Sequence, residues 1–139
     1  MNDCVTLKSE QFYLSLGFQV FESDVCFPSN TILTVSVSSN SFSATVTMDI
    51  DIKSVSVFCS ELKMLYDTLN GAAGLYEAFG DQYIKFCGDG KGHINVCGLL
   101  KSNGIDGFYQ ELKFENQIDQ TFLPAFLSSL NILADRYVK

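Results

Sequence analysis

Residues 31–46 read TILTVSVSSNSFSATV, and in this stretch apolar side chains alternate with hydroxyl-bearing side chains. Alternation with a period of two is typical of a β-strand that has one buried and one exposed face. If Ser39 and Asn40 form a two-residue turn, apolar residues of the two arms face one another in these pairs: Val37 with Phe42, Val35 with Ala44, and Leu33 with Val46. The stretch therefore predicts a hairpin with one apolar face and one face of serine and threonine.

The residues before this hairpin continue the same alternation. Apolar side chains occupy almost every second position between Phe12 and Val20, and a shorter alternating segment covers residues 5–8. We therefore expect a third long strand and a short one, so that most of the first fifty residues form an antiparallel sheet.

The period changes from two to about 3.6 between Lys53 and Asn70. Apolar residues recur there at steps of three and four: Val55, Phe58, Leu62, Leu65 and Leu69. This spacing predicts an amphipathic helix. Three residues are suitable N-caps, and the spacing does not choose among them: Asp51, Ser54 and Ser56. Gly71 stands where a C-terminal cap is expected.

A second set of short strands follows the helix. We place the first two at residues 75–79 and 83–88. The third follows the loop at 89–91 and runs to about residue 101, and the fourth covers residues 108–118. A three-residue loop at 89–91 would keep Phe86 opposite Ile94, whereas a two-residue turn would bring Phe86 opposite His93. The longer loop is therefore expected, and it places His93 opposite Cys87. In the last strand, Leu112 and Phe114 are expected to point inward, and three charged residues outward: Glu111, Lys113 and Glu115.

The final segment opens at residues 119–121 and reads as a second amphipathic helix, with Pro124 tolerated in its first turn. One broad apolar stripe runs along it: Leu123, Phe126, Leu127, Leu130, Leu133, Ala134 and Tyr137. Arg136 and Lys139 lie at its negative end, where cations are favoured. The sequence thus predicts an α+β fold, mainly antiparallel sheet in two strand meanders that can pack as a sandwich, with two amphipathic helices and one domain over residues 1–139.

Composition narrows the class of protein. The chain has 139 residues, of which 47% are hydrophobic and 18% charged, which favours a folded domain over a disordered one. It contains no apolar run near 18 residues, and its first residues lack the apolar core of a secretory signal. We therefore expect a soluble cytoplasmic protein without a membrane partner.

The cysteines and the net charge narrow the class of protein further. The five cysteines form no Cys-x-x-Cys pair, so free thiols are expected rather than disulfides or a zinc site. The formal charge of −7 would repel phosphate backbones, which argues against direct binding of nucleic acid. A basic protein is a more suitable partner for such a chain.

Three groups of residues could carry chemistry. Residues 88–92 (GDGKG) suggest a phosphate loop, but they lead into a strand, and Asp89 would oppose an anion. His93, the only histidine, could act with Cys87 as a base and nucleophile, although a structural hydrogen bond is the more common role for such a residue. The outward acids of the last strand could form a carboxylate pair, but Lys113 lies between Glu111 and Glu115. We expect no catalytic residue, no cofactor and no metal, and hence no enzyme.

Residues 88–98 (GDGKGHINVCG), followed by residues 118–127 (IDQTFLPAFL), resemble the corresponding motifs of the WapI-type immunity proteins. Residues 62–71 (LKMLYDTLNG) are similar to the helix that precedes these motifs in that family. The resemblance covers roughly residues 55–135. It implies a small cytoplasmic bacterial protein that binds and neutralises the C-terminal domain of a toxin delivered in contact-dependent competition, often a nuclease.

The function expected from this resemblance is inhibition by occlusion of a basic toxin domain. The candidate contacts are five acidic residues of the second half: Asp81, Asp89, Asp106, Glu111 and Glu115. The first half of the chain is an equal contender for the contact surface. Two alternatives stay open: a ligand-binding or enzymatic domain that uses the face of His93 and Cys87, and a structural subunit that buries one sheet face in an oligomer.

Overall fold

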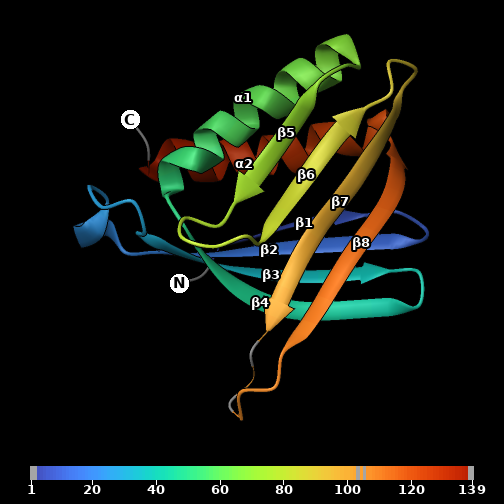
Figure 1. Cartoon of the computed structure of the whole chain (residues 1–139). Helices are drawn as coiled ribbons and strands as arrows, with labels where there is room; N and C mark the ends of the chain where they lie inside the picture. The colour runs from blue at the N-terminus through green and yellow to red at the C-terminus, as the bar shows by residue number, and fades with distance from the viewer. Residues whose placement is uncertain (1–2, 103, 105, 138–139) are drawn as a thin grey trace.

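Figure 1 shows a computed structural model of the chain, which describes residues 3–102, 104 and 106–137. The first half comprises β1 (Asp3–Lys8), β2 (Phe12–Val20), β3 (Thr31–Ser39), β4 (Phe42–Ile50) and α1 (Ile52–Thr68). The second half comprises β5 (Ala72–Tyr76), β6 (Tyr83–Gly88), β7 (His93–Ser102), β8 (Gln110–Asp119) and α2 (Leu123–Tyr137). Each half is thus a four-stranded meander followed by a helix, although the sequence contains no visible repeat.

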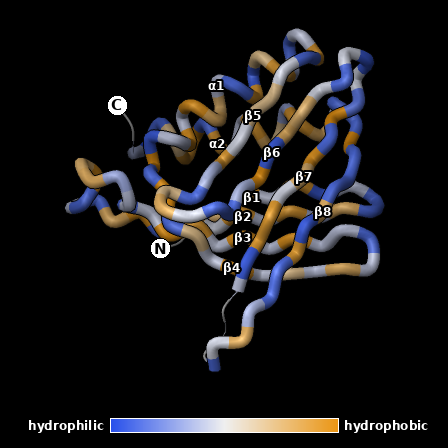
Figure 2. Tube along the Cα trace, viewed as in Figure 1, coloured by the Kyte–Doolittle hydropathy of each residue, from blue (hydrophilic) through white to orange (hydrophobic). Residues whose placement is uncertain are grey.

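The two meanders form separate antiparallel sheets, in the orders β1-β2-β3-β4 and β5-β6-β7-β8. In Figure 1 the strands of the second sheet cross in front of those of the first, and the two helices lie together along one side. The strands alternate between hydrophobic and hydrophilic residues along the chain (Figure 2). The inward residues of both sheets and both helices form one hydrophobic core, and the predicted α+β class with two antiparallel meanders is confirmed.

The predicted register of the first hairpin is wrong by two residues. Val37 lies opposite Ala44 and Val35 opposite Val46, because the turn consists of Asn40 and Ser41 instead of Ser39 and Asn40. Asn40 has φ 55°, a left-handed conformation that asparagine tolerates better than most residues. A slip of two keeps every side chain on its predicted face, so the apolar face of the hairpin is as expected.

The register between β6 and β7 also differs from the prediction by two residues. Phe86 lies opposite Val96, and Cys87 lies opposite Asn95 instead of His93. The connecting loop is longer than predicted because Gly90 and Gly92 both take positive φ values, of 81° and 101°. The predicted opposition of Cys87 and His93 is therefore wrong.

A buried asparagine side chain joins the first sheet to the start of α1. Asp51 is the N-cap, and its carboxylate accepts a hydrogen bond of 3.0 Å from the Lys53 N–H. The Asn30 side chain, fully buried, accepts from the Ile52 N–H at 2.8 Å and donates to Asp51 at 3.0 Å. This settles the choice among the three predicted N-caps.

The expected glycine cap of α1 is wrong by two residues. The left-handed residue that ends the helix is Leu69, with φ 62°, and Gly71 follows outside it. The Gly90 N–H donates to the Leu69 carbonyl across 2.8 Å, so the turn of the second sheet supports this strained residue. Gly88 is required beside it, because a Cβ there would lie 2.3 Å from the same carbonyl oxygen.

The second half agrees with the remaining predictions in outline. β5 spans residues 72–76 instead of 75–79, and β8 has Leu112 and Phe114 inward as expected. Asp119 caps the short 3-10 helix Gln120–Phe122, which leads into α2, by accepting from the Thr121 N–H at 3.0 Å. Six residues of the predicted α2 stripe are buried: Leu123, Phe126, Leu127, Leu130, Leu133 and Ala134. Lys139, predicted at the helix end, lies outside the described residues.

Candidate functional site

The five predicted contact residues are divided among three places on the second sheet. In a meander, alternate connections fall at the same end, so the β5–β6 loop with Asp81 and the β7–β8 loop with Asp106 share one end. Glu111 lies at that end of β8. Glu115 lies near the middle of β8, opposite Cys97, and Asp89 lies in the β6–β7 turn at the other end. Only part of the predicted set can therefore form one contact surface.

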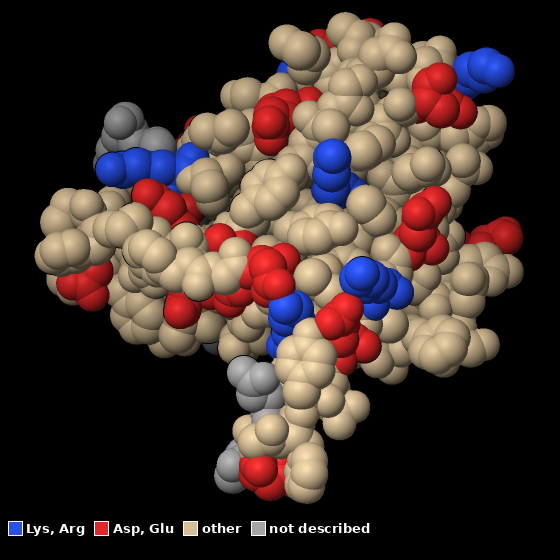
Figure 3. Space-filling model, viewed as in Figure 1, with Lys and Arg blue, Asp and Glu red and all other residues tan. Residues whose placement is uncertain are grey.

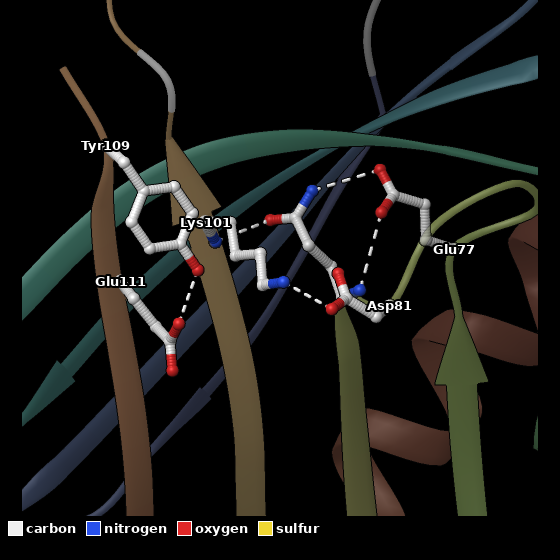
Figure 4. Close-up of polar contacts among 6 residues, drawn as sticks. Glu77, Asp81, Lys101, Tyr109 and Glu111 are labelled. Carbon is white, nitrogen blue, oxygen red and sulfur yellow. Dashed lines mark hydrogen bonds and ion pairs between the residues drawn. The ribbon is translucent and has the colours of Figure 1, made fainter.

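Asp81 and Glu111 are linked to Lys101, which lies between them on β7 (Figure 4). The Lys101 ammonium group donates to the Asp81 carboxylate and lies 5.8 Å from the centroid of the Tyr109 ring. The Tyr109 hydroxyl donates in turn to Glu111. The hydrogen bond from Lys101 lowers the pKa of Asp81 and raises that of Lys101, while the bond to Glu111 raises the pKa of Tyr109.

A buried glutamine anchors this network. The Gln82 side chain is only 6% exposed, and its oxygen accepts from the Lys101 N–H at 2.9 Å. Its nitrogen donates to Glu77 at 3.0 Å and to the Thr47 carbonyl at 3.1 Å. We call these side chains the Lys101 cluster: Glu77, Asp81, Gln82, Lys101, Tyr109 and Glu111. Gln82 had no signal in the sequence, because its partners Thr47 and Lys101 lie 35 and 19 residues away.

The Lys101 cluster combines negative charge with exposed aromatic rings. The cluster holds three carboxylates and one lysine, so negative charge is in excess. Phe108 and Tyr109 are 69% and 50% exposed, and Tyr76, 56% exposed, stacks on Tyr83 at 6.3 Å between ring centroids. Figure 3 shows that lysines are interspersed with acids on this face and that most of its surface is uncharged. The face is therefore suited to specific contacts more than to a broad electrostatic attraction.

The outer face of the second sheet also holds the residues of the alternative chemistry. His93 lies opposite Asp119, and its Nδ1 is 3.2 Å from the Asp89 carboxylate. Cys87 lies opposite Asn95, two residues from His93 along β7, so the imidazole pairs with the Asp89 carboxylate and not with a thiol. The hydrogen bond from the Lys91 N–H is the main cause that lowers the pKa of Asp89, followed by that from the His93 N–H.

The glycine-rich turn holds its own anion. The Asp89 carboxylate accepts from the Lys91 N–H at 2.6 Å and from the His93 N–H at 3.2 Å. These are the amides that would have to bind a phosphate, so Asp89 occupies the position that a ligand would take. The turn is therefore a hairpin loop capped by its own carboxylate.

Two further properties of the described residues bear on chemistry. In residues 3–102, 104 and 106–137, no three His, Cys, Asp or Glu side chains are grouped as metal ligands. All five cysteines are free thiols, as expected.

No protein-family model matches the chain, and no curated protein is significantly similar to it. Of the helices that the structure describes, none has the length and hydrophobicity needed to span a membrane.

Proposed function

We propose that this chain is a cytoplasmic immunity protein that binds a cognate bacterial toxin domain, a basic nuclease, and neutralises it by covering its active or substrate-binding site. The observation that carries the proposal is the Lys101 cluster, where carboxylates in excess over lysine lie beside exposed aromatic rings. The motifs at residues 88–98 and 118–127, with their resemblance to WapI-type immunity proteins, supply the class of partner.

The charge of the chain supports a basic partner. A nuclease must attract phosphate, so its substrate cleft is lined by lysine and arginine. A chain of net charge −7 is attracted to such a cleft from a distance, which speeds encounter. Asp81 and Glu111 can replace phosphates as acceptors once the two surfaces meet.

The exposed aromatic side chains support a protein partner over a small molecule. Phe108 and Tyr109 on one side of Lys101, and Tyr76 on the other, offer large apolar area at little entropic cost. Aromatic residues surrounded by polar groups are typical of the residues that dominate binding energy in protein interfaces.

The motif residues themselves have scaffold roles, which separates them from the proposed contact surface. Gly88 and Gly90 pack against Leu69 at the end of α1, and Asp119 caps the segment before α2. These contacts connect the second sheet to both helices. A family can therefore share the motifs as a common framework while its members bind different toxins through other residues.

The decisive experiment tests binding and inhibition together. The tagged chain is incubated with the C-terminal domain of the toxin encoded next to its gene, the complex is isolated, and cleavage of RNA and DNA is measured with and without the chain. A stable one-to-one complex that silences cleavage is expected. No binding by a folded chain would contradict the proposal and favour the ligand-binding or enzymatic alternative, which His93→Ala tests separately.

A further inference from the structure

Two of the four sheet edges are covered by the helices. α2 packs along β1, and its Arg136 forms an ion pair of 2.7 Å with Asp3. α1 packs along β5, where the Glu61 carboxylate accepts from the outward N–H of Gly74 at 3.2 Å. An added strand could not reach the backbone of either edge without displacing a helix.

The third edge, β8, carries charged side chains that disfavour pairing with an added strand. Its exposed face carries charged residues at alternate positions: Glu111, Lys113 and Glu115. Charged side chains on an edge strand are a common protection against pairing with another chain. β4 differs from β8, because every residue from Phe42 to Met48 is uncharged and none is a proline.

One half of the β4 edge is closed from within the protein. The Thr47 carbonyl accepts from the Gln82 side chain at 3.1 Å, and the Asp49 carbonyl accepts from the Ala78 N–H at 2.8 Å. These carbonyls therefore point away from β3. Alternate residues of an antiparallel strand direct their N–H and C=O groups to the same side, so those of Ser43 and Thr45 also point away from β3. β3 is the only strand paired with β4 among the described residues.

A hollow of about 310 Å³ lies beside this open half of β4. Its apolar lining comes from both sheets, from Ala44 and Val46 on β4 and from Leu100 and Leu112 on β7 and β8. Phe42, 68% exposed, stands at its edge together with Glu111 of the Lys101 cluster. A second hollow, lined by Glu77 and Lys101, adjoins it and shares Thr45, Val46 and Ser102.

We propose that an extended strand of the basic partner adds to β4 beside Ser43 and Thr45 and continues the first sheet. The backbone groups of these two residues would pair with the added strand. Its inward side chains, which must be apolar, would contact Ala44, Val46 and Leu112. Lysine or arginine at its ends would pair with Glu77, which lines one hollow, and with Glu111, which lines the other. The inference rests on the proposed function only for the source of this strand.

The test uses a synthetic strand, so that it does not depend on any toxin. An eight-residue peptide of alternating lysine and valine, blocked at both ends, is titrated into the ¹⁵N-labelled full chain. We expect amide shifts centred on Ser43 and Thr45, and hydrogen exchange of these two amides slowed at least tenfold at saturation. A glutamate–valine peptide of the same length is the charge control and should bind at least tenfold more weakly.

Two variants isolate the backbone contact. Thr45→Pro removes one outward N–H and should abolish the shifts, whereas Lys113→Pro makes the same change at the outer edge of β8 and should leave them. If Thr45→Pro does not fold, the lysine–valine peptide N-methylated at every backbone nitrogen serves instead and should not bind the unmodified chain. Binding of this methylated peptide with the same affinity would contradict strand addition.

Three other results would overturn the inference: no shifts at millimolar peptide, shifts confined to residues away from β4, or shifts of Ser43 and Thr45 that depend on protein concentration without peptide. The last would mean that a second copy of the chain occupies the edge. If the chain binds the peptide but no toxin domain, the result supports the strand site and contradicts the immunity role. If the chain binds the toxin domain but not the peptide, the result contradicts only the proposed strand site.

Discussion

The Gln82 side chain donates a hydrogen bond of 3.1 Å to the Thr47 carbonyl and so ties the second sheet to the edge of the first. The same side chain accepts from the Lys101 N–H at 2.9 Å. One buried residue therefore sets the position of the Lys101 cluster relative to the β4 edge, and both proposed contact surfaces depend on it.

Replacement of Gln82 by alanine should destabilise the fold. It would leave the Thr47 carbonyl and the Lys101 N–H without their partner, and an unsatisfied buried polar group costs about 1–3 kcal/mol. Urea denaturation of Gln82→Ala should show this loss in the free energy of unfolding. Gln117→Ala is the control, because the Gln117 side chain donates only to Asn95 on the exposed face, and it should change stability by less than about 0.5 kcal/mol.

Two strand glycines should respond differently to alanine. At Gly98 a Cβ would lie 2.6 Å from both the Phe114 ring and the Tyr83 carbonyl oxygen, so Gly98→Ala should cost about 1–3 kcal/mol. At Gly17 the closest atom would be Thr34 Cβ at 3.7 Å, an ordinary contact, so Gly17→Ala should be neutral or slightly stabilising. Equal thermal unfolding temperatures for the two variants would contradict the packing around Gly98.

The Asp89 carboxylate should make stability depend on pH in the acid range. Its pKa is lowered in the folded state, chiefly by the Lys91 N–H, so the unfolded chain binds more protons there. The stabilisation is complete above the unfolded pKa of about 3.9 and is lost as pH falls through the lower folded pKa.

The free energies of unfolding of the unmodified chain and of Asp89→Asn should therefore differ most near neutral pH and converge in acid. Denaturation at several pH values between neutrality and about pH 2 checks this. A constant difference between the two proteins at all pH values would show that the charge of Asp89 contributes nothing.

Cys59 should resist alkylation in the folded protein. Burial raises the pKa of its thiol to about 11, with a smaller contribution from Asp135, whereas Cys4 and Cys26 are exposed. Since the thiolate is the reactive form, iodoacetamide near pH 8 should label Cys4 and Cys26 at least tenfold faster than Cys59. Mass spectrometry of peptides measures the rates, and denaturant should remove the difference. Labelling of Cys59 at the rate of Cys4 in the folded chain would contradict its burial.

The double variant Asp81→Asn, Glu111→Gln should slow association with the toxin domain. It removes two charges of the Lys101 cluster without changing side-chain size, and electrostatic steering weakens when charges at the contact surface are lost. Stopped-flow measurements at low salt should show association at least several-fold slower, with a smaller difference at high salt.

The matched control for this measurement is Glu10→Gln, Asp67→Asn, which changes the net charge equally at exposed positions outside the cluster. Its association rate should stay close to that of the unmodified chain. If both double variants slow association equally, only net charge matters and the Lys101 cluster is not the contact surface.

Element type and facing were predictable because they depend on neighbours along the chain. The period-two pattern placed β2 at its observed bounds, and the 3.6-residue pattern identified the buried stripe of α2. Both hairpin registers were wrong by two residues for one reason. A slip of two leaves every side chain on the same face, so hydrophobic patterning cannot distinguish these registers. The turn conformations of Asn40, Gly90 and Gly92 make the choice.

The candidate site was predictable only in part. Asp81 and Glu111 were expected on the surface from their charge, and the predicted meander already placed Asp89 at the opposite end of the sheet, but nothing local indicated that Lys101 would join Asp81 and Glu111. The sequence by itself determined the strands, the helices and their apolar faces, because these follow from short-range periodicity. Only the tertiary structure decided which loops meet, that Gln82 bridges the sheets, and that β4 keeps an open edge, because these depend on contacts between residues far apart in the chain.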